Sequence, residues 1–166
     1  MPTLVAFPIL GVLLILQSSL VSQVPLIQGT PDLILLALAA WSLQKKVHTA
    51  WQWSIIGALM MEIASALPNG VALLGYGLTT SLGLALRQRI WRVPVLAMLV
   101  VTFVGTVSFH MFSILALRVT GNPLPIAEAL NLITLPSLLL NLLLALPMYA
   151  VLADLANVLH PEELEV

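Results

Sequence analysis

Residues 29–48 read GTPDLILLALAAWSLQKKVH, an unbroken apolar run set between a helix-start signal and a pair of lysines. Thr30 can cap a helix, Pro31 suits the first helical position, and Asp32 carries the negative charge that a helix N-terminus stabilises. The run over 33–43 holds no charged residue. We therefore expect a short hydrophobic helix there, whose beginning lies below a membrane surface.

The rest of the chain has the same apolar character. Its 166 residues are 60% hydrophobic and 8% charged, with a mean hydropathy of +1.08. A soluble domain carries about a quarter charged residues, because its surface faces water. Most helix surfaces here must instead face lipid or one another. We expect an all-α, polytopic transmembrane helix bundle that forms a single integral membrane domain over residues 1–166.

Five further apolar segments accompany the run over 33–43, and a helix needs about 20 apolar residues to cross the hydrocarbon of a bilayer. The expected spans cover residues 4–21, 51–67, 71–86, 93–117 and 132–158. A loop from Arg118 to about Asn131, rich in Pro and Asn, separates the last two. This gives about six spans. Five spans and a re-entrant segment at 33–43 are the alternative.

The basic residues predict the orientation. Five of the six Lys and Arg fall in the loops after the second and fourth spans, namely Lys45, Lys46, Arg87, Arg89 and Arg92. Arg118 alone falls on the other side. The positive-inside rule makes the richer side cytoplasmic, and with six spans both termini are cytoplasmic. Trp51 and Trp53, beside the lysines, are typical of an interfacial belt.

Four polar residues in or beside the apolar segments are candidates for partner-binding or structural roles: Asp32, Glu62, His110 and Asn141. Polar and ionisable side chains are costly in lipid and therefore raise functional hypotheses. Glu62 could contact a partner subunit or a ligand. It could also accept hydrogen bonds from the turn at Pro68-Asn69-Gly70 or pair with Arg118. We favour the structural role for Glu62, because no second carboxylate is near it in sequence.

His110 belongs to a polar stripe at helical spacing that also contains Thr102, Thr106 and Ser113. Such a stripe could line a ligand cavity or hold helices together, and we favour the second role. A lone histidine cannot form a metal site. Asn141, in the last expected span, must find a hydrogen-bonding partner inside the bundle.

The fourth expected span carries two ridges of small residues at four-residue spacing. One ridge is Gly75, Thr79 and Gly83, and the other is Gly77, Ser81 and Ala85. Small side chains at this spacing let helix backbones approach closely. We expect this span to be central and to pack against neighbours on both faces.

The chain lacks the sequence motifs of enzymes. It has no cysteine, no nucleophile elbow, no HExxH and no phosphate-binding glycine loop. We therefore expect a protein that is not an enzyme, without cofactor or metal. The net charge of −1 gives no reason to expect a nucleic-acid partner.

Three segments resemble one known family, the bacterial rod-shape-determining membrane protein MreD. The segments are GTPDLILL at 29–36, GALMMEIAS at 57–65 with Pro68, Gly70 and Gly75-Tyr76 after it, and LPSLLLN at 135–141 followed by LPMY at 146–149. The similarity covers most of the chain in order. Two features depart from the family pattern: Glu62 stands where the family usually has aspartate, and the tail is acidic at Glu162, Glu163 and Glu165.

The resemblance implies a non-enzymatic scaffold subunit of the cell-elongation machinery in the bacterial inner membrane. Such a subunit would bind an MreC-type bitopic protein. It would help to couple MreB-type filaments to peptidoglycan synthesis by RodA and a class B penicillin-binding protein.

The family also resembles the substrate-binding subunits of energy-coupling-factor transporters in fold, which supplies the alternative of a vitamin-capture subunit. Tyr76 is the best candidate for an aromatic ring in a capture pocket. Capture subunits carry alanines at four-residue spacing on the first span. Here the residue four positions after Ala6 is Leu10, so that feature is absent. We favour the scaffold.

Overall fold

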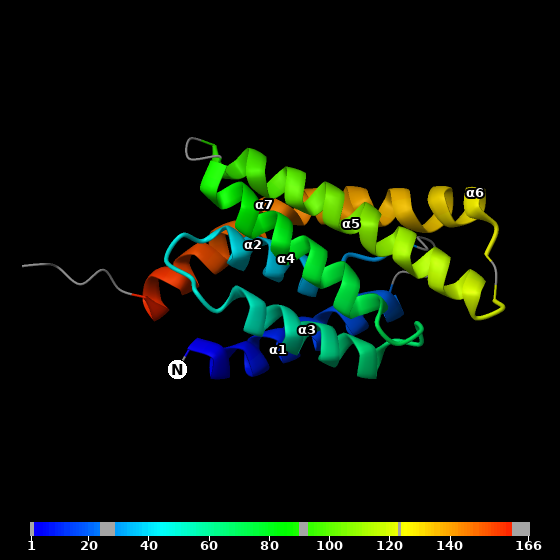
Figure 1. Ribbon diagram of the computed structural model, residues 1–166, viewed down its shortest axis with the longest axis horizontal. Helices are drawn as coiled ribbons and strands as arrows, with labels where there is room; N and C mark the ends of the chain where they lie inside the picture. The colour runs from blue at the N-terminus through cyan, green and yellow to red at the C-terminus, as the bar shows by residue number, and fades with distance from the viewer. Residues whose placement is uncertain (1, 24–28, 90–92, 123, 161–166) are drawn as a thin grey trace, which may run out of the picture.

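The computed structural model describes residues 2–23, 29–89, 93–122 and 124–160 (Figure 1). Within these ranges every regular element is helical. The elements are α1 (Pro2–Gln23), α2 (Leu33–Leu43), α3 (Ala50–Ala64), α4 (Val71–Arg89), α5 (Pro94–Val119), α6 (Ile126–Glu128), the π-helical turn η1 (Ala129–Thr134) and α7 (Leu135–Leu159). Arg92 and the acidic tail of the sequence analysis lie outside the described residues.

Successive helices run in opposite directions along one axis (Figure 1). The short helix α2 lies at the centre. Helices α1 and α3 lie along one side, α5 and α7 along the other, and α2 and α4 between them. Helix α2 packs against α1, α3, α4, α5 and α7, and all eleven of its residues are buried. Eleven residues rise only about 16 Å, so this central helix is shorter than its neighbours.

The capping residue of α2 differs from the prediction by two positions. Asp32, and not Thr30, is the N-cap: its Oδ1 accepts a hydrogen bond of 2.9 Å from the backbone N–H of Leu35. Thr30 and Pro31 precede the helix. A carboxylate that accepts from the third residue of the helix satisfies one of the N–H groups that a helix start leaves without an intrahelical partner.

The predicted loop from Arg118 to Asn131 is too long. Arg118 lies in the last turn of α5, and the chain becomes helical again at Ile126. Pro125 is the residue just before this helix, where a missing N–H does no harm. Pro136 follows η1 and lies in the first turn of α7; the wider π turn accommodates it, because proline cannot donate a backbone hydrogen bond.

The exterior of the bundle is apolar. Large hydrophobic side chains project outward from every long helix except the buried α2; the most exposed include Ile63, Leu74, Leu115, Leu139, Leu143 and Val158. Within the described residues, two helical stretches are long and apolar enough to cross a membrane, Pro94–Val119 and Ile126–Leu159. Helices α1 and α2 contain shorter apolar stretches.

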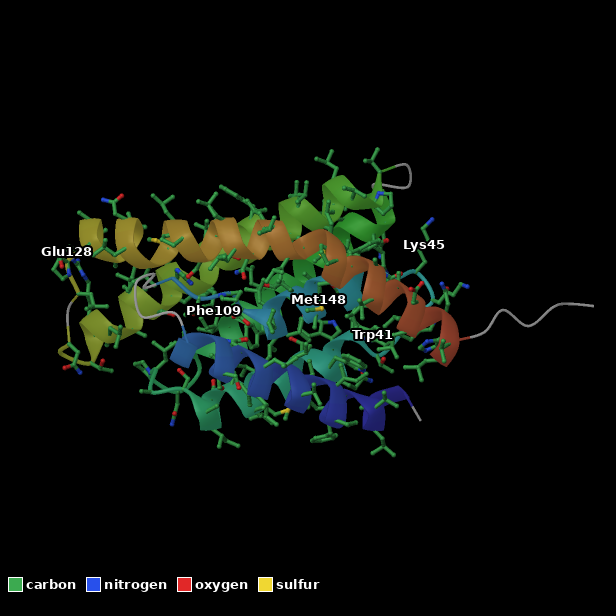
Figure 2. The ribbon with its side chains drawn as sticks, turned by 180° about the vertical axis from the view of Figure 1, so that it is seen from behind. Trp41, Lys45, Phe109, Glu128 and Met148 are labelled. Carbon is green, nitrogen blue, oxygen red and sulfur yellow. The ribbon has the colours of Figure 1, made fainter. Side chains whose placement is uncertain are left out.

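Charged side chains mark the two ends of the bundle. Lys45 and Glu128 lie at opposite ends of the long axis (Figure 2). We call the end with Lys45, Lys46 and Arg87 the basic end. The predicted pair of interfacial tryptophans is split there: Trp51 is half exposed, whereas Trp53 is fully buried and stacks on Trp41 with ring centroids 4.2 Å apart. The prediction was wrong for Trp53, because α2 supplies a ring for it to stack on.

Candidate functional site

The polar core of the molecule lies at the buried start of α2, where Asp32 meets Tyr76 of α4. The Tyr76 hydroxyl donates to both carboxylate oxygens of Asp32, at 3.1 Å to Oδ1 and 3.0 Å to Oδ2. Tyr76 is fully buried, and its ring stacks on Phe109 of α5. The carboxylate is therefore engaged by both its own helix and α4.

Asn141 of α7 joins the same network from the other side of the bundle. Its Oδ1 accepts from the backbone N–H of Asp32 at 2.8 Å, and its Nδ2 donates to Thr106 Oγ1 of α5 at 2.9 Å. Both Asn141 and Thr106 are buried. One amide thus connects α2, α5 and α7, as a buried polar group must if it is to avoid an unpaired donor or acceptor.

Two more side chains complete the start of α2. Gln17 Oε1 of α1 accepts from the backbone N–H of Leu33 at 2.9 Å, and Ser137 Oγ of α7 accepts from the N–H of Thr30 at 2.9 Å. Gly29 permits this close approach, since a Cβ there would lie 2.5 Å from Pro136 Cβ. Side chains from α1 and α7, and Asp32 itself, therefore accept from backbone N–H groups at the start of α2 and just before it. We call Gln17, Asp32, Tyr76, Thr106, Ser137 and Asn141 the α2 network.

Glu62 lies outside the α2 network. Its Oε1 accepts from the backbone N–H of Gly70 at 2.7 Å, which ties the end of α3 to the start of α4. Gly70 has a φ of +94°, a backbone conformation that favours glycine. This is the bond from the turn that we considered in the sequence analysis. Among the described residues Arg118 forms no ion pair with Glu62; its side chain is exposed.

The polar stripe of α5 faces α7 and η1. Thr106 belongs to the α2 network, and His110 Nδ1 lies 3.0 Å from Thr134 Oγ1 of η1. The Thr134 hydroxyl also lies 3.2 Å from the carbonyl oxygen of Ala129, and the tautomer of His110 decides which group donates in the His110–Thr134 pair. Ser113 donates to its own helix, and the buried hydroxyl of Thr102 has no hydrogen-bonding partner in the described structure.

A cavity of about 250 Å³ lies beside this stripe. Its polar lining consists of His110, Ser113 and Thr134, and the rest is apolar, with Phe109 and Leu117 among the lining side chains. Each of the three polar groups already has a hydrogen-bonding partner within the chain. The stripe thus holds α5 to η1 and leaves few polar groups for a solute.

The two small-residue ridges of α4 differ in their surroundings. Gly75, Thr79 and Gly83 are buried: a Cβ on Gly75 would lie 2.5 Å from the Phe109 ring, and one on Gly83 would overlap the Ser42 hydroxyl. This ridge packs α4 against α5 and α2.

The second ridge corrects the prediction that both ridges pack inside the bundle. Gly77 is partly covered, with the Trp51 ring 4.0 Å from the position of an added Cβ. Ser81 and Ala85 are exposed, because α2, α3 and α5 occupy the other sides of α4. We call Gly77, Ser81 and Ala85 the outward ridge.

Arg87 has a structural role that the sequence analysis did not assign to it. Its Nη1 donates to the backbone carbonyls of Gln44 at 3.0 Å and Val47 at 2.7 Å. These carbonyls follow the C-terminus of α2, where helices leave acceptors unpaired and favour a positive charge. Lys46 Nζ, nearby, donates to Asn157 Oδ1 of α7 at 3.3 Å.

The comparisons with known proteins add no relative. Neither the protein-family models nor the curated proteins nor the solved structures contain a match to this chain. Among the described residues, no group of three His, Asp or Glu side chains could share a metal ion.

The structure brings together two of the four polar candidates, Asp32 and Asn141, and places Glu62 and His110 elsewhere. Sequence reasoning missed Gln17 and Ser137 and gave Tyr76 a different role. The available signal for Gln17 was a single amide within an apolar segment, which in lipid must have a partner.

Proposed function

We propose that this chain is a multi-pass protein of the bacterial inner membrane, with about six spans and both termini in the cytoplasm. Within that membrane it acts as a non-enzymatic scaffold of the MreD type. The apolar exterior supports the membrane location, since a water-facing surface so rich in exposed Leu, Ile and Val would aggregate. The gathering of Lys45, Lys46 and Arg87 at one end supports a cytoplasmic basic end.

The observation that supports the scaffold role is that the polar side chains of the α2 network bond to one another and to the backbone. Asp32, Tyr76 and Asn141 bond to one another and to backbone groups of α2, and neither the cavity beside His110 nor the one at the basic end is lined by them. A ligand site would instead present convergent polar groups to an open pocket. The α2 network therefore supports a rigid body whose function lies on its surface.

The outward ridge is the surface best suited to a partner helix. Gly77, Ser81 and Ala85 lie on one lipid-facing side of α4, and small residues at this spacing let a second helix approach closely. An MreC-type bitopic protein supplies a single membrane helix of the required kind. Through it, the scaffold would connect MreB-type filaments with RodA and a class B penicillin-binding protein.

The second candidate function is capture of a vitamin-sized solute, and the cavity beside His110 is the observation that favours it. Its volume of about 250 Å³ is below the roughly 300–1,000 Å³ usual for such ligands. Tyr76, the ring that capture would use, is buried against Asp32. Both points weigh against a capture subunit.

Co-purification with an MreC-type partner tests the scaffold role. We expect a stable complex on size exclusion in detergent, weakened at least about tenfold by Ala85→Leu, because a bulky side chain holds the partner helix away. Ala150→Leu is the matched control: Ala150 is also exposed, on α7. The absence of a complex, together with a thermal shift on adding a vitamin-sized solute, would favour the capture function instead.

A further inference from the structure

The long helical stretch formed by α6, η1 and α7 changes its hydrogen-bond register at η1. The backbone N–H of Leu135 donates to the carbonyl of Leu130, five residues earlier. Pro136 comes next and has no N–H to donate to the preceding turn. Kinks in long helices occur at π turns and at prolines, because both interrupt the regular ladder of backbone bonds. Here the two are adjacent, so this helix should bend most easily at residues 134–136.

The part of the helix that follows this point is fixed to the start of α2. Ser137 Oγ accepts from the backbone N–H of Thr30 at 2.9 Å, and Asn141, one turn later, bonds to the same segment. Gly29 lies against Pro136, since a Cβ on the glycine would be 2.5 Å from the proline Cβ. The fixed part of the helix therefore begins directly at the end of the π turn.

The part of the helix that precedes this point is covered much less. We call residues 126–134 the arm. All three residues of α6 are exposed, and within the arm only Ala129 and Thr134 are buried. Outside its own helix, η1 packs chiefly against α5, and Figure 1 shows α6 and the last turn of α5 diverging toward this end of the bundle. Segments with few buried contacts move first. The arm can therefore move while the α2 network stays intact.

A hydrogen-bonded pair and a cavity lie between the arm and α5. His110 Nδ1 lies 3.0 Å from Thr134 Oγ1, at the end of the arm next to the π turn's last residues. The cavity of about 250 Å³ lies beside this pair, and its walls include Ala129 and Ile133 of the arm and Leu117 of α5. Because protein interiors are close-packed, a space of this size gives the arm room to approach α5.

We propose that the arm is a hinged lid, which pivots at residues 134–136 and thereby widens or closes the cavity beside His110. The His110–Thr134 pair is the latch that holds the arm in the position seen here. Hinges of this kind are a few residues at the end of an element that absorb the change in backbone angles, while the parts on either side move as rigid bodies. The inference goes beyond the scaffold role and does not depend on it.

The test measures distances between spin labels in the full-length protein in detergent, by double electron–electron resonance. The chain has no cysteine, so labels attach only to cysteines that are introduced. The test pair is Glu128→Cys on the arm with Leu115→Cys on α5. The control pair is Leu143→Cys on α7, on the other side of the hinge, with Phe103→Cys on α5. All four side chains are exposed. We expect the distance distribution of the test pair to be at least about twice as broad as that of the control pair.

Two variants change the hinge in opposite directions. Thr134→Val removes the hydroxyl of the latch and keeps the shape of the side chain, so the test pair should broaden further while the control pair stays unchanged. Pro136→Ala restores a backbone donor beside the π turn, so the test pair should become about as narrow as the control pair. A single size-exclusion peak at the wild-type volume shows that each variant is folded.

The remaining outcomes also decide the proposal. A narrow test pair that broadens only in Thr134→Val would support the hinge, with the arm latched in the wild type. A test pair as narrow as the control pair in both proteins would overturn it. Equal broadening of both pairs would also overturn it, because the whole bundle and not the arm would then be moving. Failure of the hinge would leave the scaffold role intact, since partner binding tests that role.

Discussion

The backbone groups at the two ends of α2 are hydrogen-bonded by different kinds of side chain. At its start, inside the bundle, the backbone N–H groups are met by short neutral side chains and one carboxylate, from Gln17, Asp32 and Asn141. At its end, near the basic surface, the carbonyls beyond the helix accept from the guanidinium of Arg87. The anion thus lies at the positive end of the helix dipole and the cation at the negative end.

The difference follows from where each end lies. Water cannot reach the start of α2, so each of its polar groups needs a protein partner in fixed geometry. The end of α2 lies beside the partly exposed Gln44 and Lys46, where water can replace a lost donor. We therefore expect the loss of one hydrogen bond to lower the stability of the protein more at the start of α2 than at its end.

Asp32→Ala should have the largest effect. It removes the cap of α2 and the acceptor of the Tyr76 hydroxyl, so we expect a loss of about 3–4 kcal/mol in stability. Thermal unfolding followed by tryptophan fluorescence, to which the stacked Trp41–Trp53 pair contributes, measures it. Asp32→Asn is the control: asparagine caps as well as aspartate, so it should lose less than half as much. Equal losses would mean that charge matters here and capping does not.

Asn141→Leu should come second. The change leaves the N–H of Asp32 and the hydroxyl of Thr106 without their partner, for an expected loss of about 2–3 kcal/mol. Thermal unfolding in the same detergent, without chemical denaturant, allows direct comparison with Asp32→Ala. A stability within experimental error of the wild type would show that the start of α2 tolerates unpaired polar groups. The proposed difference between the two ends of α2 would then be wrong.

Tyr76→Phe should lose less, about 1 kcal/mol, because Asp32 keeps its bond from Leu35 and the ring keeps its stacking on Phe109. The sharper measurement is a double-mutant cycle. In the Asp32→Ala background the same change should have almost no further effect, since the acceptor is already gone. Full additivity of the two losses would mean that the hydroxyl bond contributes nothing.

Arg87→Gln should have the smallest effect, about 0.5–1 kcal/mol, because water can solvate the carbonyls of Gln44 and Val47 at the surface. The same thermal assay applies. A loss as large as that of Asn141→Leu would erase the distinction between the two ends of α2.

The sequence predicted the local features of the fold well. The apolar run over 33–43 matches the bounds of α2, and the turn before Val71 matches the start of α4, because hydrophobic runs and turn signals act within a few residues. Prolines were the exception. Pro125 and the asparagines around it suggested a long loop, whereas the chain is helical from Ile126 onward by way of a π turn.

The partners of the buried polar groups could not be predicted. Asn141 signals only that it needs a partner, and that partner, Asp32, is 109 residues away in sequence. Likewise the two ridges of α4 have the same spacing and similar residues, and nothing in them distinguishes the inward ridge of Gly83 from the outward ridge of Ala85. Which face is covered depends on the paths of the other helices.

The bonds between α2 and α7 also constrain how the chain is made. The N–H groups of Thr30 and Asp32 receive their acceptors from Ser137 and Asn141, which the ribosome adds 107 and 109 residues later. Under the proposed membrane location, hydrocarbon offers no acceptor for these N–H groups. We therefore expect the start of α2 to reach its final place only after α7 has been made.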